Sequence, residues 1–342
     1  MRIGFSFLTN TAGFPISEGL HYNPTDVNGY AFLVGIVNTL RISVIGIVFA
    51  TIIGVVIGIS RLSSNWLVKK LAGIYVEVVR NIPLLVQLFF WYFAVMLTSL
   101  PVVKNSIRLP GSIYLTRRGV YLPWVTLAES FGAWVWYIVG GLILAIGVYL
   151  FRRIQLQRAE RPGFPIIWAL AAFTLVSVAG WFITPGNPLN LSLPVLKKFN
   201  FEGGLSLSTS FTALLIGLSV YTAAFIAEIV RAGILAIGKG QTEAASAVGL
   251  GKVQILRLVI LPQALRVIIP PLASQYLNLT KNSSLAILIG YYDLMNVGTT
   301  IFNQTGRAVE MILLIMASYL VMSLLTSLAM NYYNRRMKLV ER

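Results

Sequence analysis

The sequence predicts an all-α membrane protein, a polytopic bundle of about seven transmembrane helices with the N-terminus outside and the C-terminus inside. Three observations predict this class. The chain has 342 residues, of which 57% are hydrophobic and only 11% are charged, whereas soluble domains carry roughly a quarter charged residues. The apolar residues form runs close to the roughly 20 residues that a helix needs to cross a bilayer. Lysines and arginines gather in alternate loops between these runs.

The predicted spans follow one another along the chain, separated by loops of unequal length. The N-terminal segment before the first span has no apolar core of signal-peptide length. The sixth span is short and contains Pro270-Pro271, and the apolar stretch Leu285–Gly290 behind it is expected to be a re-entrant or half-span element. The spans are predicted at Phe32–Ile59, Ile82–Leu100, Gly132–Phe151, Phe164–Ile183, Phe211–Ile237, Ala264–Leu279 and Val309–Met330.

The loops differ in charge and in composition. The alternate loops that hold the larger share of lysine and arginine are predicted to be cytoplasmic, and the loop after the fifth span is one of them. The two long loops on the predicted outer side, Pro101–Phe131 and Thr184–Ser210, are rich in Pro, Gly, Ser and Asn and are expected to be irregular turns.

Composition excludes several classes of function. The net charge of +16 could indicate nucleic-acid binding, but the cations lie in short clusters between apolar runs, so we expect no nucleic-acid partner. The chain has no cysteine, which excludes disulfides, thiol catalysis and cysteine metal sites. The one histidine, His21, cannot build a metal site alone. No catalytic residue and no metal site are predicted.

The segment between the fifth and sixth spans is polar but has a regular pattern. Gly238 and Gly240 are expected to end the fifth span, because glycine adopts the left-handed conformation that closes helices. Thr242 is expected to cap a short helix of small side chains, with Glu243 in its first turn. Gly249 is expected to end this helix.

A second, amphipathic helix is predicted at residues 252–261. Val253, Leu256 and Ile260 recur at i, i+3 and i+7 along it, and Pro262 is expected to end it before the sixth span. These patterns fit two interpretations equally well: a surface that docks a partner, or a loop that shields the base of the bundle.

The order of residues in this segment resembles the EAA motif of ABC importer membrane subunits. The resemblance rests on Glu243-Ala244-Ala245, then Gly249, then Val259-Ile260-Leu261-Pro262. In that family the segment is a coupling helix that docks into a groove of the ATP-hydrolysing subunit, so the resemblance implies an ABC importer (MetI-like) permease fold and favours the docking interpretation. The predicted ATPase-coupling residues are Gly240, Glu243, Ala244, Ala245, Gly249, Leu261 and Pro262.

Three further stretches are similar to permeases of polar amino-acid importers: Tyr75–Val95, Ser219–Ile234 and Gln275–Leu294. Two extra spans stand where such permeases usually run on directly, which resembles the Q-type subunit of the general L-amino-acid importers of the Aap/Bzt kind. The implied organisation is a periplasmic N-terminal segment (1–29), the first two spans of the permease core (30–100), an insertion with two spans (101–204), the remaining core (205–338) with the coupling segment 238–262, and a cytoplasmic tail (339–342).

The resemblance also implies partners and location. The chain is expected to be a non-catalytic pore subunit in the bacterial inner membrane, in contact with the lipid bilayer. It is expected to pair with a homologous second permease as a heterodimer, with ABC ATPase subunits and with a periplasmic amino-acid-binding protein. The chain has no GxxxxGK[ST] loop, so ATP and Mg would be used by the partner ATPase, and this chain is expected to bind no cofactor.

Polar residues inside the spans are candidates for the translocation path of the amino-acid substrate, because polar groups at membrane depth line a cavity or bond to neighbouring helices. For Gln87 the alternative is a structural hydrogen bond, and for Glu228 it is an i,i+3 ion pair with Arg231. The candidates are Gln87, Glu228, Asn278, Lys281 and Ser284.

A secondary, ion-coupled transporter is the alternative function. Such a transporter needs ionisable relays at mid-membrane and often has inverted repeats. Glu228 is the one deep carboxylate that the sequence indicates, and no coupling segment would be expected.

Overall fold

A computed structural model describes residues 4–159 and 163–337 of the chain. Within these residues, six helices are long and apolar enough to cross a membrane, and a seventh span is obtained if the bent pair Trp66–Asn81 and Leu84–Ser99 counts as one. The predicted class, a polytopic helical membrane protein, is therefore confirmed. The predicted tail 339–342 lies outside the described residues.

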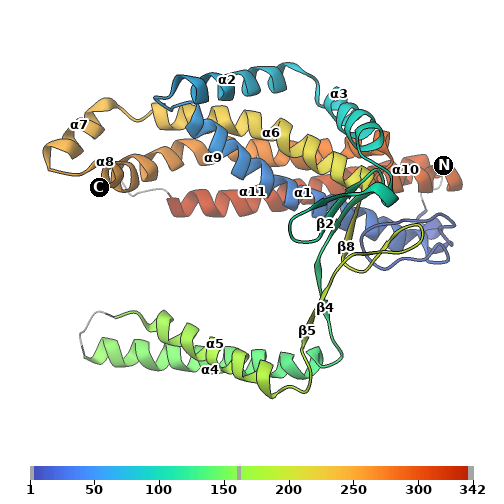
Figure 1. The fold of residues 1–342 in the computed structure, drawn as a ribbon, viewed down its shortest axis with the longest axis horizontal. Coiled ribbons are helices and arrows are strands. Elements are labelled where there is room, and N and C mark those ends of the chain that lie inside the picture. Colours follow the sequence, from blue (N-terminus) through green and yellow to red (C-terminus); the bar gives the residue numbers. More distant parts are fainter. Residues whose placement is uncertain (1–3, 160–162, 338–342) are drawn as a thin grey trace. The chain divides into compact units, whose positions relative to one another are not determined.

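The chain divides into two compact units. Unit 1 comprises Met1–Pro101, Arg117–Gly119 and Leu207–Arg342, and unit 2 comprises Val102–Thr116 and Val120–Ser206. In unit 1, long helices run side by side (Figure 1). Its helical elements are η1 (Ser6–Thr9), α1 (Asn28–Ser60), α2 (Trp66–Asn81), α3 (Leu84–Phe89), the π-helical η2 (Phe90–Ser99), α6 (Thr209–Leu235), α7 (Lys239–Ala247), α8 (Lys252–Gln254), the π-helical η4 (Ile255–Ile260), α9 (Leu261–Asn282), the 3-10 helix η5 (Ser283–Ile289), α10 (Leu294–Thr305) and α11 (Ala308–Met337).

Helices α1 and α6 have the most extensive contact of any helix pair in unit 1. Gly46, Ala50, Gly54 and Gly58 recur every fourth residue on α1, which places small side chains on one helix face. A Cβ at Gly54 would lie 2.6 Å from the Cβ of Ile226 on α6. The small residues therefore let the two backbones approach each other, and the buried core of the unit forms around this seam.

The N-terminal segment is folded onto the bundle. Phe7 and Phe14 are buried in one hydrophobic cluster with residues of α1, α10 and α11. Asn28 donates a hydrogen bond to the Phe7 carbonyl at 3.0 Å, and Asn38 donates one to the Tyr292 carbonyl at 2.8 Å. Buried amides thus satisfy backbone carbonyls where irregular chain covers the helices.

The second span is bent. Helix α2 and the following helical stretch Leu84–Ser99 meet at 105°. Asn65 caps α2 by accepting hydrogen bonds from the backbone N–H groups of Leu67 and Val68. Pro83 is the N-cap of α3, and the bend lies at the residue before it because proline disfavours helical conformation in its predecessor.

Unit 2 contains an antiparallel helix pair and short strands. Helices α4 (Phe131–Arg158) and α5 (Pro165–Ile183) pack together, and Trp134 and Trp181 meet edge to face at 5.3 Å between ring centroids. The strands are β1 (Ile107–Leu109), β2 (Ile113–Thr116), β3 (Gly119–Leu122), β4 (Trp124–Leu127), β5 (Leu189–Ser192), β6 (Val195–Leu196), β7 (Phe201–Glu202) and β8 (Leu205–Ser208). The first residue of β3 and the last two of β8 belong to unit 1.

The expectation of irregular turns in the long outer loops is wrong. The strands form a sheet in the order β1-β2-β3-β8 and two strand pairs, β4-β5 and β6-β7. The turn between β1 and β2 places Gly111 at φ 81° and Ser112 at φ 57°, conformations typical of tight hairpin turns. Runs such as Ile113–Thr116 are rich in β-branched and aromatic residues, and their strand propensity outweighs the turn-forming composition of the loops as a whole.

The sixth span is longer than predicted. A single helix runs from Lys252 through η4 and α9 to Asn282, so neither Pro262 nor the pair Pro270-Pro271 ends it. Pro262 lies in the first turn of α9, directly after a π-helical stretch in which Leu261 donates to the Leu256 carbonyl. Because proline has no N–H, this change of hydrogen-bond register accommodates it without a break.

Candidate functional site

The predicted coupling segment forms a helical hairpin, α7 followed by α8 and η4. Helix α7 begins at Lys239, and its N-cap is Gly238 at φ −59°. The expectations that Gly238 and Gly240 close the fifth span in left-handed conformation and that Thr242 caps the next helix are therefore wrong. Thr242 lies inside α7, where its carbonyl accepts a hydrogen bond from the Ser246 hydroxyl at 2.9 Å. Helix α6 already ends at Leu235, which leaves room for the earlier start of α7.

The EAA residues do not all point the same way. Glu243 and Ala244 are exposed, whereas Ala245 is 6% exposed and Ile255 of η4 is 5% exposed. Helix α7 packs on η4, so Ala245 contributes to the internal packing of the hairpin. Val248 is 76% exposed at the end of α7.

The turn of the hairpin depends on glycine. Gly249 has φ 85°, in the region that side chains disfavour, and a Cβ built there would meet nothing within 4 Å. Gly251 follows, and its N–H donates to the side-chain oxygen of Gln254 at 2.9 Å. This is half of a capping box, and it fixes the start of the second helix. The predicted break at Gly249 is present in the structure.

The hairpin is joined mechanically to the sixth span. The Gln263 amide contacts the Gln241 side-chain oxygen at 3.2 Å, which links α9 to α7. The second arm of the hairpin continues without interruption into α9. A force applied to the hairpin would therefore act directly on this long helix.

Gln87 stabilises the bend of the second span. Its side chain is 8% exposed, and its Nε2 donates to the carbonyls of Val79 at 2.8 Å and Ile82 at 2.9 Å. These carbonyls lose their helical partners where α2 ends. The geometry is that of the structural hydrogen bond considered from the sequence, and the role of Gln87 in transport stays a prediction.

Glu228 lies between two arginines. The guanidinium of Arg231 contacts its Oε1 at 2.5 Å, which is the i,i+3 pair considered from the sequence. Arg61, at the end of α1, pairs with its Oε2. Sequence reasoning missed Arg61, because the two residues are far apart in the chain. A cavity of about 390 Å³ is lined by Arg61 and Glu228, together with Glu77 and Arg80 of α2.

The remaining candidates lie on or just after α9. Asn278 and Lys281 are exposed on α9. Ser284 is half-buried, and its hydroxyl donates to the Lys281 carbonyl at 2.8 Å. Asn278 and Lys281 are three residues apart on α9 and therefore share a helix face, and Ser284 follows three residues after Lys281. The proposed apolar tail Leu285–Gly290 is mostly the 3-10 helix η5.

A buried acid was not predicted from the sequence. Asp293 is fully buried in the turn before α10, where its Oδ1 accepts the N–H of Asn296 at 2.9 Å. The Tyr319 hydroxyl donates to its Oδ2 at 3.3 Å. Burial raises the pKa of Asp293 to about 7. The available sequence signal was an Asp three residues before Asn296 at the start of a helix, which is typical of an N-cap.

Comparison with known proteins extends these observations. The chain is 46% identical to the putative amino-acid ABC transporter permease protein YhdX of Escherichia coli, over 99% of this chain and 86% of that protein. It is 48% identical to the general L-amino acid transport system permease protein AapQ of Rhizobium johnstonii, over 99% and 84%. These relatives favour the importer prediction and give no support to the ion-coupled alternative.

Solved structures share the fold. A crystal structure of an amino acid ABC transporter with histidines matches with a TM-score of 0.54 at 22% identity, covering 90% of this chain and 94% of that one. The MetNI methionine ABC transporter in an inward-facing conformation matches with a TM-score of 0.51 at 14% identity, covering 91% and 98%. At these identities the likeness concerns the fold alone, which is the predicted MetI-like permease fold.

The family model for the "binding-protein-dependent transport system inner membrane component" matches residues 138–339, more than half of the chain. Together with the membrane-spanning helices, this match assigns the protein to the inner membrane as a multi-pass component. The chain belongs to the family of binding-protein-dependent transport system inner membrane components.

Proposed function

We propose that this chain is the transmembrane pore subunit of an ATP-driven ABC importer for amino acids. The observation that carries the proposal is the similarity to permeases of amino-acid transport systems along nearly the whole chain. Both relatives are named as amino-acid transport permeases, and this gives the proposed substrate class.

The helical hairpin of α7, α8 and η4 docks a partner ATPase in this proposal. Glu243 gives the docking surface a negative charge, and Ala244 is a small side chain beside it. Val248 and Val253 add apolar side chains that are 76% and 78% exposed. Gly240 lies on α7, and Ala245 supports the surface from inside. Leu261 and Pro262 lie where the hairpin becomes α9, so they transmit the motion of the docked surface.

ATP hydrolysis takes place in the partner ATPase, which holds ATP and Mg, and this chain is non-catalytic and holds no cofactor. Closure of an ATPase pair would pull the hairpin. The continuous helix from Lys252 to Asn282 would then tilt and switch the bundle between inward-open and outward-open states.

Further partners complete the proposed importer. A homologous second permease forms a heterodimer with this chain, and a periplasmic amino-acid-binding protein delivers the substrate.

Within this chain, residues 30–100 and 205–338 form the permease core, and 101–204 are an insertion. Exposed Asn278 and Lys281 with neighbouring Ser284 are the candidates for the substrate path, with Gln87 and Glu228 as additional candidates.

The test is co-purification of the ATPase together with ATP-dependent amino-acid uptake by the reconstituted importer. Gly249→Val should abolish both, because a β-branched residue at φ 85° is strained by about 1–3 kcal/mol. Gly249→Asn is the matched control and should retain both, since asparagine tolerates the left-handed region.

Charge reversal gives a second arm of the test. Glu243→Lys should release the ATPase, whereas Glu129→Lys, at an exposed acid of unit 2, should not. Uptake by this chain without ATP, or unchanged ATPase binding by both Gly249→Val and Glu243→Lys, would refute the proposal.

A further inference from the structure

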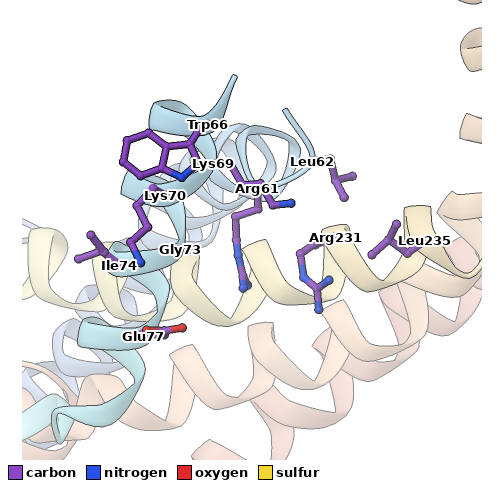
Figure 2. A pocket seen from close by; sticks show the side chains of 10 residues that line it. All are labelled: Arg61, Leu62, Trp66, Lys69, Lys70, Gly73, Ile74, Glu77, Arg231 and Leu235. Atoms are coloured by element: carbon purple, nitrogen blue, oxygen red, sulfur yellow. The ribbon is translucent and has the colours of Figure 1, made fainter. Parts of the chain in front are cut away.

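A second cavity opens at the end of the bundle where α1, α2 and α6 meet, and Figure 2 shows the side chains around it. Its volume is about 580 Å³. Four cationic residues line it: Arg61 from the end of α1, Lys69 and Lys70 from α2, and Arg231 from α6. Glu77 is the acid among the lining residues.

The charges of this cavity are not balanced. Arg61 and Arg231 share the carboxylate of Glu228, and Glu77 supplies one further negative charge. Lys69 and Lys70 are exposed, and neither forms an ion pair among the residues that the structure describes. The cavity therefore keeps a surplus of positive charge, carried mainly by the two lysines.

The same cavity has an apolar wall. Leu62, Trp66, Ile74 and Leu235 also line it, and Trp66 is 73% exposed. Next to it, the outward face of α2 exposes Leu67 and Leu71 at 55% and 57%. Tryptophan at a span end is typical of the membrane–water interface. A ligand that fits both parts has an anionic head and an apolar body.

We propose that this cavity binds the headgroup of an anionic phospholipid. Its phosphate would lie against Lys69, Lys70 and Arg61, because cationic side chains form charge-assisted hydrogen bonds with phosphate oxygens. Its acyl chains would follow the apolar face of α2 beside Trp66. Basic cavities between helices on the cytoplasmic side of a membrane are suited to anionic headgroups, and the positive-inside pattern predicts that these loops are cytoplasmic.

The test is native mass spectrometry of the complete importer assembly, delipidated and then titrated with phosphatidylglycerol or phosphatidylcholine. We expect preferential binding of phosphatidylglycerol. Each cation near an anionic lipid contributes roughly a factor of five in affinity. The double variant Lys69→Gln/Lys70→Gln should therefore bind phosphatidylglycerol about 25-fold more weakly.

The matched control is Arg152→Gln/Arg153→Gln, which removes the same charge from α4. These arginines follow the same positive-inside pattern but do not line this cavity, and Arg152 lies over the Trp168 ring at 4.6 Å. An equal loss in the control would overturn the proposal, because binding would then reflect general surface charge.

Two further outcomes would also overturn it. If glycerol phosphate or inorganic phosphate displaces phosphatidylglycerol at equal concentration, the cavity is a site for a soluble anion. If the wild-type assembly binds the two lipids equally, the cavity is covered by another subunit or does not select headgroups. Loss confined to the lysine variant, with phosphate unable to compete, supports the lipid site.

Discussion

The seam between α1 and α6 gives a sharp test of the packing. In Gly54→Ala, the new Cβ would lie 2.6 Å from the Cβ of Ile226 and 3.0 Å from the carbonyl oxygen of Ala223. Carbon atoms in contact prefer about 3.5–4.0 Å, so the helices must separate by roughly 1 Å. The next turn is equally tight, because a Cβ at Gly58 would lie 2.7 Å from the Ala227 carbonyl oxygen.

Overpacking of this kind costs about 1–3 kcal/mol. Alanine has a higher helix propensity than glycine, which offsets up to about 1 kcal/mol of this loss of stability. We therefore expect Gly54→Ala to lower the free energy of unfolding by about 1–2 kcal/mol.

The assay is unfolding of the purified protein in mixed micelles as the fraction of denaturing detergent rises. Gly73→Ala is the control, because a Cβ at Gly73 of α2 meets nothing within 4 Å. We expect this variant to be unchanged or up to about 1 kcal/mol more stable. Equal stability of the two variants would refute the argument that close backbone approach at Gly54 holds the seam together.

Three other changes test a buried acid, an ion pair and a helix cap. Burial raises the pKa of Asp293 from 3.8 to about 7, so the folded state holds a proton that the unfolded state releases, and stability falls as pH rises from about 4 to 7. Asp293→Asn should remove this pH dependence, which amounts to on the order of 4 kcal/mol over that window. Unfolding at several pH values measures it, and an unchanged slope of stability against pH would contradict the raised pKa of Asp293. Glu228→Gln leaves Arg61 and Arg231 facing each other without the carboxylate and should lower the free energy of unfolding by about 1–3 kcal/mol. Adding Arg61→Gln to this variant should restore part of the lost stability, and no restoration would contradict the reasoning. Asn65→Ala removes the N-cap of α2 and should lower the free energy of unfolding by about 1 kcal/mol. The unfolding midpoint should fall in this variant but not in Asn65→Asp, which keeps a capping side chain.

Much of the fold was accessible from the sequence because it depends on local composition. The spans follow from apolar run length, and the break at Gly249 follows from its position between two helical patterns. The errors arose where neighbouring signals competed. Pro262 and Pro270-Pro271 indicate helix ends, yet the helix continues, since a π-helical stretch and neighbouring helices accommodate prolines within a span. The strands of unit 2 were missed because short β-branched runs lay inside loops rich in turn-forming residues.

The candidate site was likewise predicted from the sequence only in part. The sequence was sufficient to predict two helices around Gly249 in the proposed coupling segment, but it did not show that Ala245 is buried against the second helix while Glu243 is exposed. Gln87 and Glu228 were recognised as unusual polar residues within spans. The pair of Glu228 with Arg231 was considered from the sequence. Arg61 and the carbonyl partners of Gln87 were not, because these contacts depend on how helices bend and cross.

By itself, the sequence determined the class of the protein, the approximate positions of its spans and the helix break at Gly249, since hydrophobicity and helix-breaking residues act over one or two turns. Only the tertiary structure decided that Arg61 meets Glu228 across 167 residues of chain and that Lys69 and Lys70 line a basic cavity with Arg231. These arrangements depend on the close approach of α1 and α6 at Gly54, and the sequence of neither helix specifies the register in which the two pack.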